Sequence, residues 1–456
     1  MSTIQTLLAF VVALGVLVVV HELGHFLAAR YCGVKVLRFA VGFGYPLVRF
    51  IAGKDKTEWR IGVIPFGGYV KMLDATEGPV PDEEAGRSFD RQSLWRRMFI
   101  VAAGPMANFG FAILIYLVLN CVGVPDMKAV VAEPAPGTAA ASAGVHEHDE
   151  IVSIAGEPIS GWQDLRWRLV QIRLSSTETV ALGVVRNGNA EATVVTLGLG
   201  GPGQTSLDED FFERTGLRAY RPALAPVIGH ISEDSPASAA GLRQGDRVLA
   251  ANGRPVDTWD VLVKLVRGNP GINLRLTIER NGQRIEVPVR PASVAFMGSE
   301  IGRIGAGPLV PTDYAAEFQV VNAYPLGEAL WRAIRRTTEL STFTLRSLGM
   351  MITGEISLRH LSGPVAIADY AGQSAQLGWM SYVGFIALIS VSLGILNLLP
   401  VPVLDGGHLL YYLLEVLRGK PISVRALEFA QKIGLSILVS AMALALYNDV
   451  NRLLAG

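Results

Sequence analysis

Four long apolar stretches stand out along the chain, separated by segments in which polar and charged residues are frequent. They cover roughly residues 6–29, 98–122, 379–399 and 429–447. An apolar helix of about 20 residues is long enough to cross the hydrocarbon core of a bilayer. The pattern therefore predicts a polytopic α-helical membrane protein with four transmembrane helices. The first stretch lacks the small-residue cleavage site of a secretory signal peptide, so we expect it to be retained as a span.

Basic residues predict how the spans are oriented. The segment between the first two spans and the short loop between the last two are both rich in Lys and Arg. Cytoplasmic loops carry an excess of these residues, so both segments are expected on the cytoplasmic side. The N-terminus, the long segment 125–378 and the C-terminus then lie on the outer side.

The long outer segment contains an internal repeat. Residues 144–158 align with residues 241–255 at a constant offset, which also pairs Trp162 with Trp259. Each copy predicts a turn, a strand, a second turn, an amphipathic helix and further strands. We therefore expect two tandem α+β domains, at residues 125–200 and 222–293, rather than a solenoid.

The remaining segments complete the predicted organisation. Residues 1–124 form an N-terminal membrane part, and residues 378–456 form a C-terminal one. Residues 294–377 include amphipathic helices, for which packing against the outer domains and lying on the bilayer surface both fit the pattern. Residues 36–71 alternate apolar and polar positions between glycines, which predicts short strands. These strands fit either an ordinary cytoplasmic hairpin or a sheet edge that dips toward the site described next.

A polar cluster, His21-Glu22-x-x-His25, interrupts the first apolar stretch. Two histidines four residues apart project from the same face of a helix and can hold one metal ion. Glu22 is not needed as a ligand in such motifs, and we expect it to be the catalytic base that accepts a proton from the attacking water. Ionisable residues inside a membrane span are costly and usually functional. The alternative is a solvated pair at the membrane boundary.

A third ligand is expected near the other end of the chain. Asp405 lies in a segment broken by Pro and Gly that follows the third apolar stretch. The predicted topology places it and the histidines at the cytoplasmic ends of their spans, so all three lie at the same depth. Catalytic zinc sites use three protein ligands and one open position. His21, His25 and Asp405 therefore predict one Zn²⁺ per chain.

Two asparagines each have two candidate roles. Asn397 either donates a hydrogen bond to the oxyanion or the substrate backbone, or it caps the broken end of the third span. Asn108 in the second span either makes a structural hydrogen bond between helices or supports the site.

Together, the histidine motif and the run Asn397-x-x-Pro400-x-Pro402-x-Leu404-Asp405 resemble the site-2 protease family of intramembrane zinc metalloproteases. The resemblance covers nearly the whole chain and is closest to the branch that regulates sigma-E in Gram-negative bacteria. It implies a multi-pass protein of the bacterial inner membrane. Its active site would face the cytoplasmic side, and its outer segment would lie in the periplasm.

The resemblance implies further details. The strands near residues 36–71 would form a membrane-associated β-hairpin that carries Gly42-Phe43-Gly44 at the substrate site. Asn108 belongs to a Gly-x-x-x-Asn pattern of the family, which favours a role in supporting the site. The two repeats are similar to circularly permuted bacterial PDZ domains, which bind peptides by adding a strand to a sheet edge.

The resemblance also implies the substrates. These are single-span membrane proteins that have first been cut on the outer side, in particular a trimmed anti-sigma factor of the envelope stress response. Remnant signal peptides are a second class. The PDZ-like domains would act either as a size filter or as a receptor for the new substrate end. The alternative is a catalytically inactive, membrane-anchored PDZ scaffold.

Composition adds two exclusions. The formal net charge of the 456 residues is +0, which gives no reason to expect a nucleic-acid partner. The lipid bilayer and the membrane-protein substrates are the partners that we expect. The two cysteines, Cys32 and Cys121, lie in separate regions and predict neither a disulfide framework nor a Cys-rich metal site.

Overall fold

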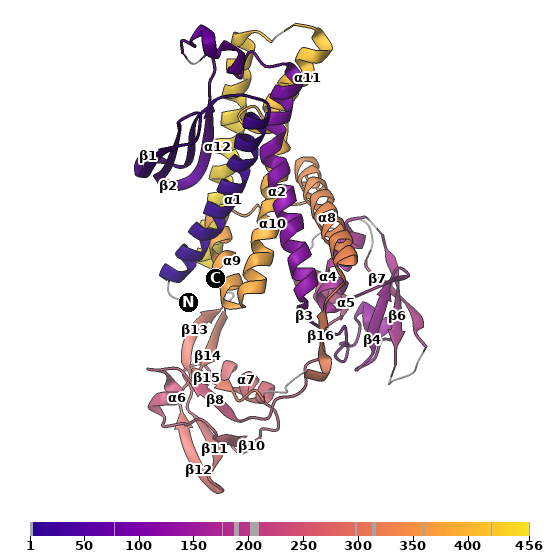
Figure 1. Cartoon of the computed structure of the whole chain (residues 1–456). Coiled ribbons are helices and arrows are strands. Elements are labelled where there is room, and N and C mark those ends of the chain that lie inside the picture. Colours follow the sequence, from indigo (N-terminus) through magenta and orange to yellow (C-terminus); the bar gives the residue numbers. More distant parts are fainter. Residues whose placement is uncertain are drawn as a thin grey trace. The chain divides into compact units, whose positions relative to one another are not determined.

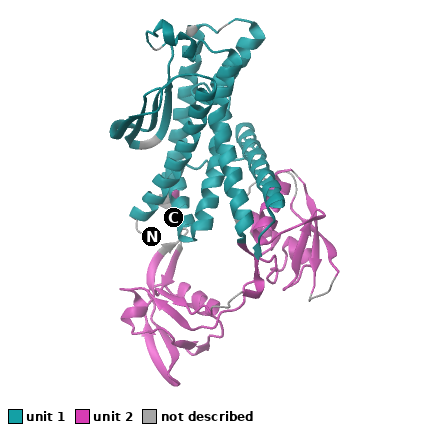
Figure 2. Ribbon diagram, in the orientation of Figure 1, with its two compact units in different colours: residues 1–124, 321–450 teal, residues 125–320, 451–456 magenta. Residues whose placement is uncertain are grey.

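The computed structural model describes residues 3–76, 78–175, 177–186, 191–200, 209–296, 299–311, 316–358, 361–420 and 422–455. The chain divides into two compact units (Figure 2). Residues 1–124 and 321–450 form the first, and residues 125–320 and 451–456 form the second. Each unit is described on its own.

Helices dominate the first unit (Figure 1). They are α1 (Thr3–Tyr31), α2 (Leu94–Val122), α8 (Leu326–Thr353), α9 (Pro364–Gln376), α10 (Trp379–Leu398), α11 (Asp405–Arg418) and α12 (Val424–Ala455). A short 3-10 helix, Asp82–Arg87, precedes α2. Among the described residues, four helices are long and apolar enough to cross a membrane, within α1, α2, α10 and α12. They confirm the four predicted spans.

Small residues allow α1 and α2 to pack with their backbones in contact. A Cβ atom built on Gly24 of α1 would lie 2.3 Å from the carbonyl oxygen of Ala103 and 2.7 Å from Cβ of Ala107. Such close approach replaces the hydrophobic effect as the source of helix association inside a bilayer. The same helix α2 also packs against α10, so it connects the first and third spans.

The hairpin after α1 consists of β1 (Val36–Ala52) and β2 (Thr57–Met72), which pair antiparallel. These strands are longer than the short ones predicted, and they bend. Val41 pairs with both Gly68 and Ile61, so the first half of β1 lies between the two halves of β2. Glycines at the bend, including Gly42 with φ +80°, permit this course because they adopt positive φ without strain. Several apolar side chains of the hairpin are exposed: Phe43, Tyr45, Leu47, Phe50, Ile51 and Val63.

The predicted amphipathic region after the repeats contains one long helix, α8. Its buried side chains, Ala329, Ala333, Thr337 and Leu340, recur at helical spacing along one face. Helices α2 and α10 of the same unit provide the surface against which α8 packs.

The second unit contains two sheets of the same strand order. The first is β5-β4-β6-β7, formed by Glu157–Pro158, Glu150–Ile154, Thr179–Val185 and Thr193–Gly198, with helices α3 (Ala139–Ser142), α4 (Trp162–Leu174) and α5 (Glu209–Thr215). The second is β10-β9-β11-β12, formed by Arg254–Pro255, Arg247–Ala251, Leu274–Arg280 and Gln283–Val289, with α6 (Pro236–Ala239) and α7 (Trp259–Arg267).

Short strands flank these sheets. They are β3 (Val124–Met127), β8 (Ile228–Ile231), β13 (Ala292–Phe296), β14 (Ser299–Arg303), β15 (Ala306–Pro308) and β16 (Gln319–Asn322), with a 3-10 helix at Ala316–Phe318. Each four-stranded sheet has its own apolar core, around Leu165 and Leu169 in one and around Leu262 and Val266 in the other.

A shared polar contact shows that the two repeats fold alike. Asp246 accepts hydrogen bonds from Arg280 and from the backbone N–H of Arg243. Asp149 accepts one from the backbone N–H of His146 and forms an ion pair with Arg186, whose Nε lies 3.5 Å from Oδ2. Burial alone would raise the pKa of Asp246, but the hydrogen bonds from Arg280 and Arg243 outweigh it and the pKa lies below its ordinary value.

The last span holds the start of α9 through one buried carboxylate. Asp449 of α12 accepts hydrogen bonds at 2.9–3.1 Å from the backbone N–H groups of Gly363, Val365 and Ala366. These are N-terminal groups of α9, which have no partner within the helix. Asp449 therefore caps α9 from a segment distant in sequence.

We expect Asp449→Ala to lower the free energy of unfolding by about 1–3 kcal/mol, because it leaves buried N–H groups without acceptors. The measurement is thermal unfolding of the detergent-solubilised chain. Asp369→Ala is the matched control, since Asp369 lies exposed on α9 itself and accepts a hydrogen bond from the side chain of the exposed Gln373. Equal unfolding temperatures for the two variants would show that the cap contributes nothing.

Candidate metal centre

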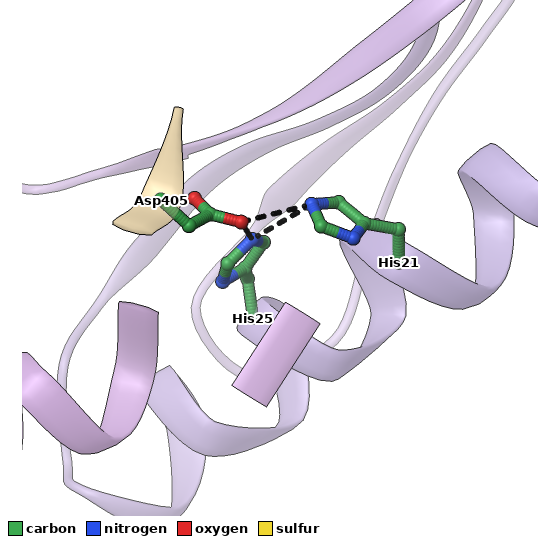
Figure 3. A group of neighbouring side chains, drawn as sticks. All are labelled: His21, His25 and Asp405. Atoms are coloured by element: carbon green, nitrogen blue, oxygen red, sulfur yellow. Dashed lines mark hydrogen bonds and ion pairs between the residues drawn. The ribbon is translucent and has the colours of Figure 1, made fainter. Parts of the chain in front are cut away.

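Three side chains from two distant parts of the sequence converge in the first unit (Figure 3). Nε2 of His21 lies 3.2 Å from Oδ2 of Asp405, and Nε2 of His25 lies 3.4 Å from the same oxygen. The two Nε2 atoms are 3.3 Å apart. The structure thus brings together the three residues expected to be metal ligands.

The three atoms have the spacing that a zinc ion requires. Ligands about 2.0–2.1 Å from a tetrahedral zinc lie about 3.3 Å from one another. Oδ2 of Asp405 is buried and has no hydrogen-bond partner among the described residues. A buried carboxylate oxygen without a donor is costly unless a cation neutralises it. The residues therefore fit zinc, with two imidazoles and one carboxylate as donors.

His25 is oriented by α2. Its Nδ1 atom lies 2.8 Å from the carbonyl oxygen of Ile100, so Nδ1–H donates there and Nε2 keeps the lone pair that a metal needs. A Cβ atom on Gly104 would lie 2.2 Å from Nε2 of His25. The absence of a side chain at Gly104 therefore provides the space for the imidazole. Pro105 follows it inside the helix and cannot donate a backbone hydrogen bond to the preceding turn.

His21 is oriented by Asn108, which is fully buried. The Nδ2 atom of Asn108 lies 3.3 Å from Nδ1 of His21, while its Oδ1 atom is buried without a partner among the described residues. The two ends of an amide are assigned from the hydrogen bonds they make. With Oδ1 turned toward His21, Asn108 accepts a hydrogen bond from Nδ1–H and leaves Nε2 free to bind the metal. Of the two roles expected for Asn108, this contact supports the one at the site.

A break between two helices positions Asp405 beside the histidines. Helix α10 ends at Leu398 and α11 begins at Asp405, with two prolines between them. Glycines let this loop pack tightly, because a Cβ on Gly406 would lie 2.2 Å from the carbonyl oxygen of Leu398. Asp405 is the first residue of α11, where the partial positive charge of the helix N-terminus favours a carboxylate.

Glu22 of α1 is buried beside His21, His25 and Asp405. The hairpin approaches it closely, since a Cβ atom on Gly68 of β2 would lie 2.9 Å from Cγ of Glu22. Sequence reasoning did not identify Gly68. The signal was the Gly67-Gly68 pair inside an otherwise strand-like run, which marks a close backbone approach.

The other predicted site residues are Asn397 and the segment Gly42-Phe43-Gly44. Asn397 is half-buried in the last turn of α10, and within the described part of the chain no hydrogen bond joins it to the three ligands. Gly42, Phe43 and Gly44 lie at the bend of β1, where the Phe43 ring stacks on Tyr69 at 6.2 Å. They belong to the hairpin that reaches Glu22 through Gly68.

Comparison with known proteins matches this site to a family. The model of peptidase family M50 matches residues 9–441. The regulator of sigma-E protease RseP of Escherichia coli is 42% identical over 453 residues, covering 99% of this chain and 100% of that one. A protein of Ralstonia nicotianae named as a zinc metalloprotease is 41% identical, covering 98% of both chains. The regulator of sigma E protease of Salmonella typhi is 40% identical, covering 99% and 100%. The chain therefore belongs to peptidase family M50, the site-2 protease family of membrane-embedded zinc metalloproteases.

Proposed function

We propose that this zinc metalloprotease cleaves single-span membrane proteins within their transmembrane segments, with His21, His25 and Asp405 as zinc ligands. The observation that carries the proposal is the convergence of three ligand atoms, from two membrane-spanning regions, beside the buried carboxylate of Glu22. The alternative of an inactive scaffold has no support in this geometry, because both the ligand set and the base are in place.

Each residue has a distinct role in the proposed reaction. When bound, zinc polarises the scissile carbonyl and lowers the pKa of the attacking water. Glu22 accepts the proton of that water and passes it to the leaving amine. Asn108 and the carbonyl of Ile100 keep the imidazoles in the tautomer that presents Nε2. Asn397 is the proposed donor to the oxyanion or the substrate backbone.

The proposed orientation places the site toward the cytoplasm and the second unit in the periplasm of a bacterial inner membrane. The basic segment between α1 and α2 and the basic loop between α11 and α12 support it through the positive-inside rule. The exposed apolar side chains of the hairpin, such as Phe50 and Ile51, support its association with the membrane.

The hairpin is the proposed contact for the scissile segment. A helical peptide bond is shielded by its own hydrogen bonds, so the substrate must become extended before attack. The second half of β2, residues 68–72, pairs with the first half of β1 and approaches Glu22 at Gly68. An extended substrate that adds a strand near Gly42-Phe43-Gly44 would pass beside the catalytic base.

The names of the relatives support a physiological substrate. Two of them are named as regulators of sigma E. We accordingly propose a trimmed anti-sigma factor of the envelope stress response as a substrate of this chain, and remnant signal peptides as a second class.

The two repeats are proposed to be PDZ-like domains, with the boundaries given above. A cavity of about 290 Å³ lies in the second repeat between α7 and β14. One edge of β14 pairs with β13, and the other pairs with no described strand. This edge beside a cavity supports a receptor role for the second repeat more directly than a size filter.

Glu22→Gln should retain zinc and lose cleavage by about 10²–10⁴-fold, because only the proton transfer is removed. Asp405→Ala should lose both zinc and cleavage. The measurement is cleavage of a trimmed single-span substrate in proteoliposomes, with metal content determined on the same samples. A normal cleavage rate for Glu22→Gln would exclude its role as the base and reopen the scaffold alternative.

Gly104→Ala should reduce zinc content and cleavage together, because the added methyl group would occupy the space of the His25 ring. Gly110→Ala is the matched control on the same helix, since a Cβ there meets nothing within 4 Å. Both changes favour helix formation by about 1 kcal/mol, so loss of helix stability cannot explain a difference. If both variants bind zinc normally, His25 does not need this space.

Removal of both repeats distinguishes receptor from filter. The backbone N–H of Lys128 donates to the carbonyl of Phe318 at 2.8 Å. A short Gly/Ser linker can therefore join Lys128 to Phe318 in place of residues 129–317. A receptor role predicts that cleavage of trimmed substrate falls by at least about 10-fold. Cleavage of intact, untrimmed substrate by this variant would instead establish a filter.

A further inference from the structure

Helix α11 presents one proposed zinc ligand at its start and buries little of the rest of its length. Asp405 is its first residue, and its fully buried residues are the next two, Gly406 and Gly407. Farther along, α11 exposes large apolar side chains: Leu413, Leu414, Val416 and Leu417. A helix rises about 1.5 Å per residue, so the far end of α11 lies about 20 Å from Asp405. Contacts beyond the first turn therefore have to fix the direction in which α11 runs.

A charged side chain of α2 makes such a contact. Nη2 of Arg97 lies 3.3 Å from Oε1 of Glu415. The guanidinium carbon of Arg97 also lies 5.0 Å from the centre of the Tyr412 ring, within the range of a cation–π contact. Tyr412 and Glu415 are three residues apart, so they share one face of α11. One guanidinium thus contacts α11 at two points beyond its first turn.

The contact between Arg97 and Glu415 is largely shielded from solvent. Their side chains are 19% and 23% exposed, so water and salt screen the pair less than they screen a surface pair. The neighbouring Arg96 differs, because it is exposed and donates to Gln92, four residues before it, at 3.0 Å. Arg96 therefore contacts its own segment of chain, whereas Arg97 joins two helices.

The two helices that Arg97 joins are the ones that hold His25 and Asp405. On α2, Arg97 precedes Ile100 by three residues, and the Ile100 carbonyl accepts the hydrogen bond from Nδ1 of His25. On α11, it contacts the helix that begins with Asp405, whose Oδ2 atom lies 3.4 Å from Nε2 of His25. Fixing α11 against α2 therefore helps to fix the distance between these two ligand atoms.

We propose that Arg97 is a positioning residue for the metal centre, because its contact with α11 holds that helix in the direction that brings Asp405 to the histidines. The ligand atoms repel one another before the ion binds, so contacts outside the site have to keep them close. The inference rests on the proposed role of Asp405 as a zinc ligand. It adds that zinc affinity depends on a cation that contacts α11 about 15 Å along the helix from that ligand.

The test is the zinc affinity of the full-length chain in detergent, measured by competition with a chromogenic chelator. Arg97→Ala should raise the zinc Kd by about 10–100-fold, as expected when a residue that supports a ligand is removed. Glu415→Ala should also raise it, and the double variant should not exceed Arg97→Ala, because both changes break one contact. Arg97→Lys should recover most of the affinity, since it keeps the charge near Glu415. Arg96→Ala is the matched control and should bind zinc like the unaltered chain.

Thermal unfolding of the same samples without metal separates positioning from general stability. A merely structural role would lower the unfolding temperature of Arg97→Ala and leave the zinc Kd of the folded chain unchanged. That result, or equal zinc affinities for Arg97→Ala and Arg96→Ala, would overturn the inference. If Arg97→Ala does not fold, Glu415→Gln replaces it, since it removes the charge and keeps the shape of the side chain. Normal zinc binding by Glu415→Gln would overturn the inference as well.

Asp405→Ala in the same assay tests the ligand assignment separately. Normal zinc binding by Asp405→Ala would contradict the proposed metal site, and the inference with it. Loss of zinc by Asp405→Ala together with normal binding by Arg97→Ala would contradict the inference alone.

Discussion

Three electron-rich atoms lie within 3.4 Å of one another in the interior of this protein, and the rest of the first unit holds them there. Two imidazole nitrogens and a carboxylate oxygen at this spacing repel one another unless a cation lies between them. The arrangement is favourable with zinc bound, because a dication offsets the cost of burying the carboxylate. Metal binding and the packing of α1, α2 and the α10–α11 loop are consequently one coupled equilibrium.

Close backbone approach is the means by which the chain meets this constraint. Gly24 brings α1 against α2, Gly104 leaves room for His25, and Gly406 lets the loop fold back on the end of α10. At each of these positions a single Cβ atom would collide with backbone or with a ligand. The polar contacts come from a single helix, because Ile100 orients His25 and Asn108 orients His21. Helix α2 thus supports both histidines although it contributes no ligand.

The sequence predicted the convergence of His21, His25 and Asp405, because local periodicity and topology determine it. His21 and His25 share a helix face whatever surrounds them, and the charge pattern of the loops placed Asp405 at the same depth. Contacts across the fold were not predictable in this way. The approach of Gly68 to Glu22 depends on how β2 bends, and the choice between two roles for Asn108 required its position relative to His21. The capping of α9 by Asp449 joins segments more than eighty residues apart. The Gly67-Gly68 pair marks a close backbone approach but not its partner, and the contacts of Asn108 and Asp449 have no signature within a short window of sequence.

In the two repeats as well, the aligned residues specify one part of the structure and leave another part open. Their aligned residues include Asp149 and Asp246, which hold the same turn, and the tryptophans that begin α4 and α7. These positions specify the sheet, its turns and its helix, and the two sheets have the same strand order. The segments before Gly216 and Gly305 lie outside the aligned residues and adopt different secondary structure, helix α5 in the first repeat and strand β14 in the second. A repeated scaffold therefore constrains the sheet and its helix, while a segment outside the aligned residues can adopt different secondary structure in each copy.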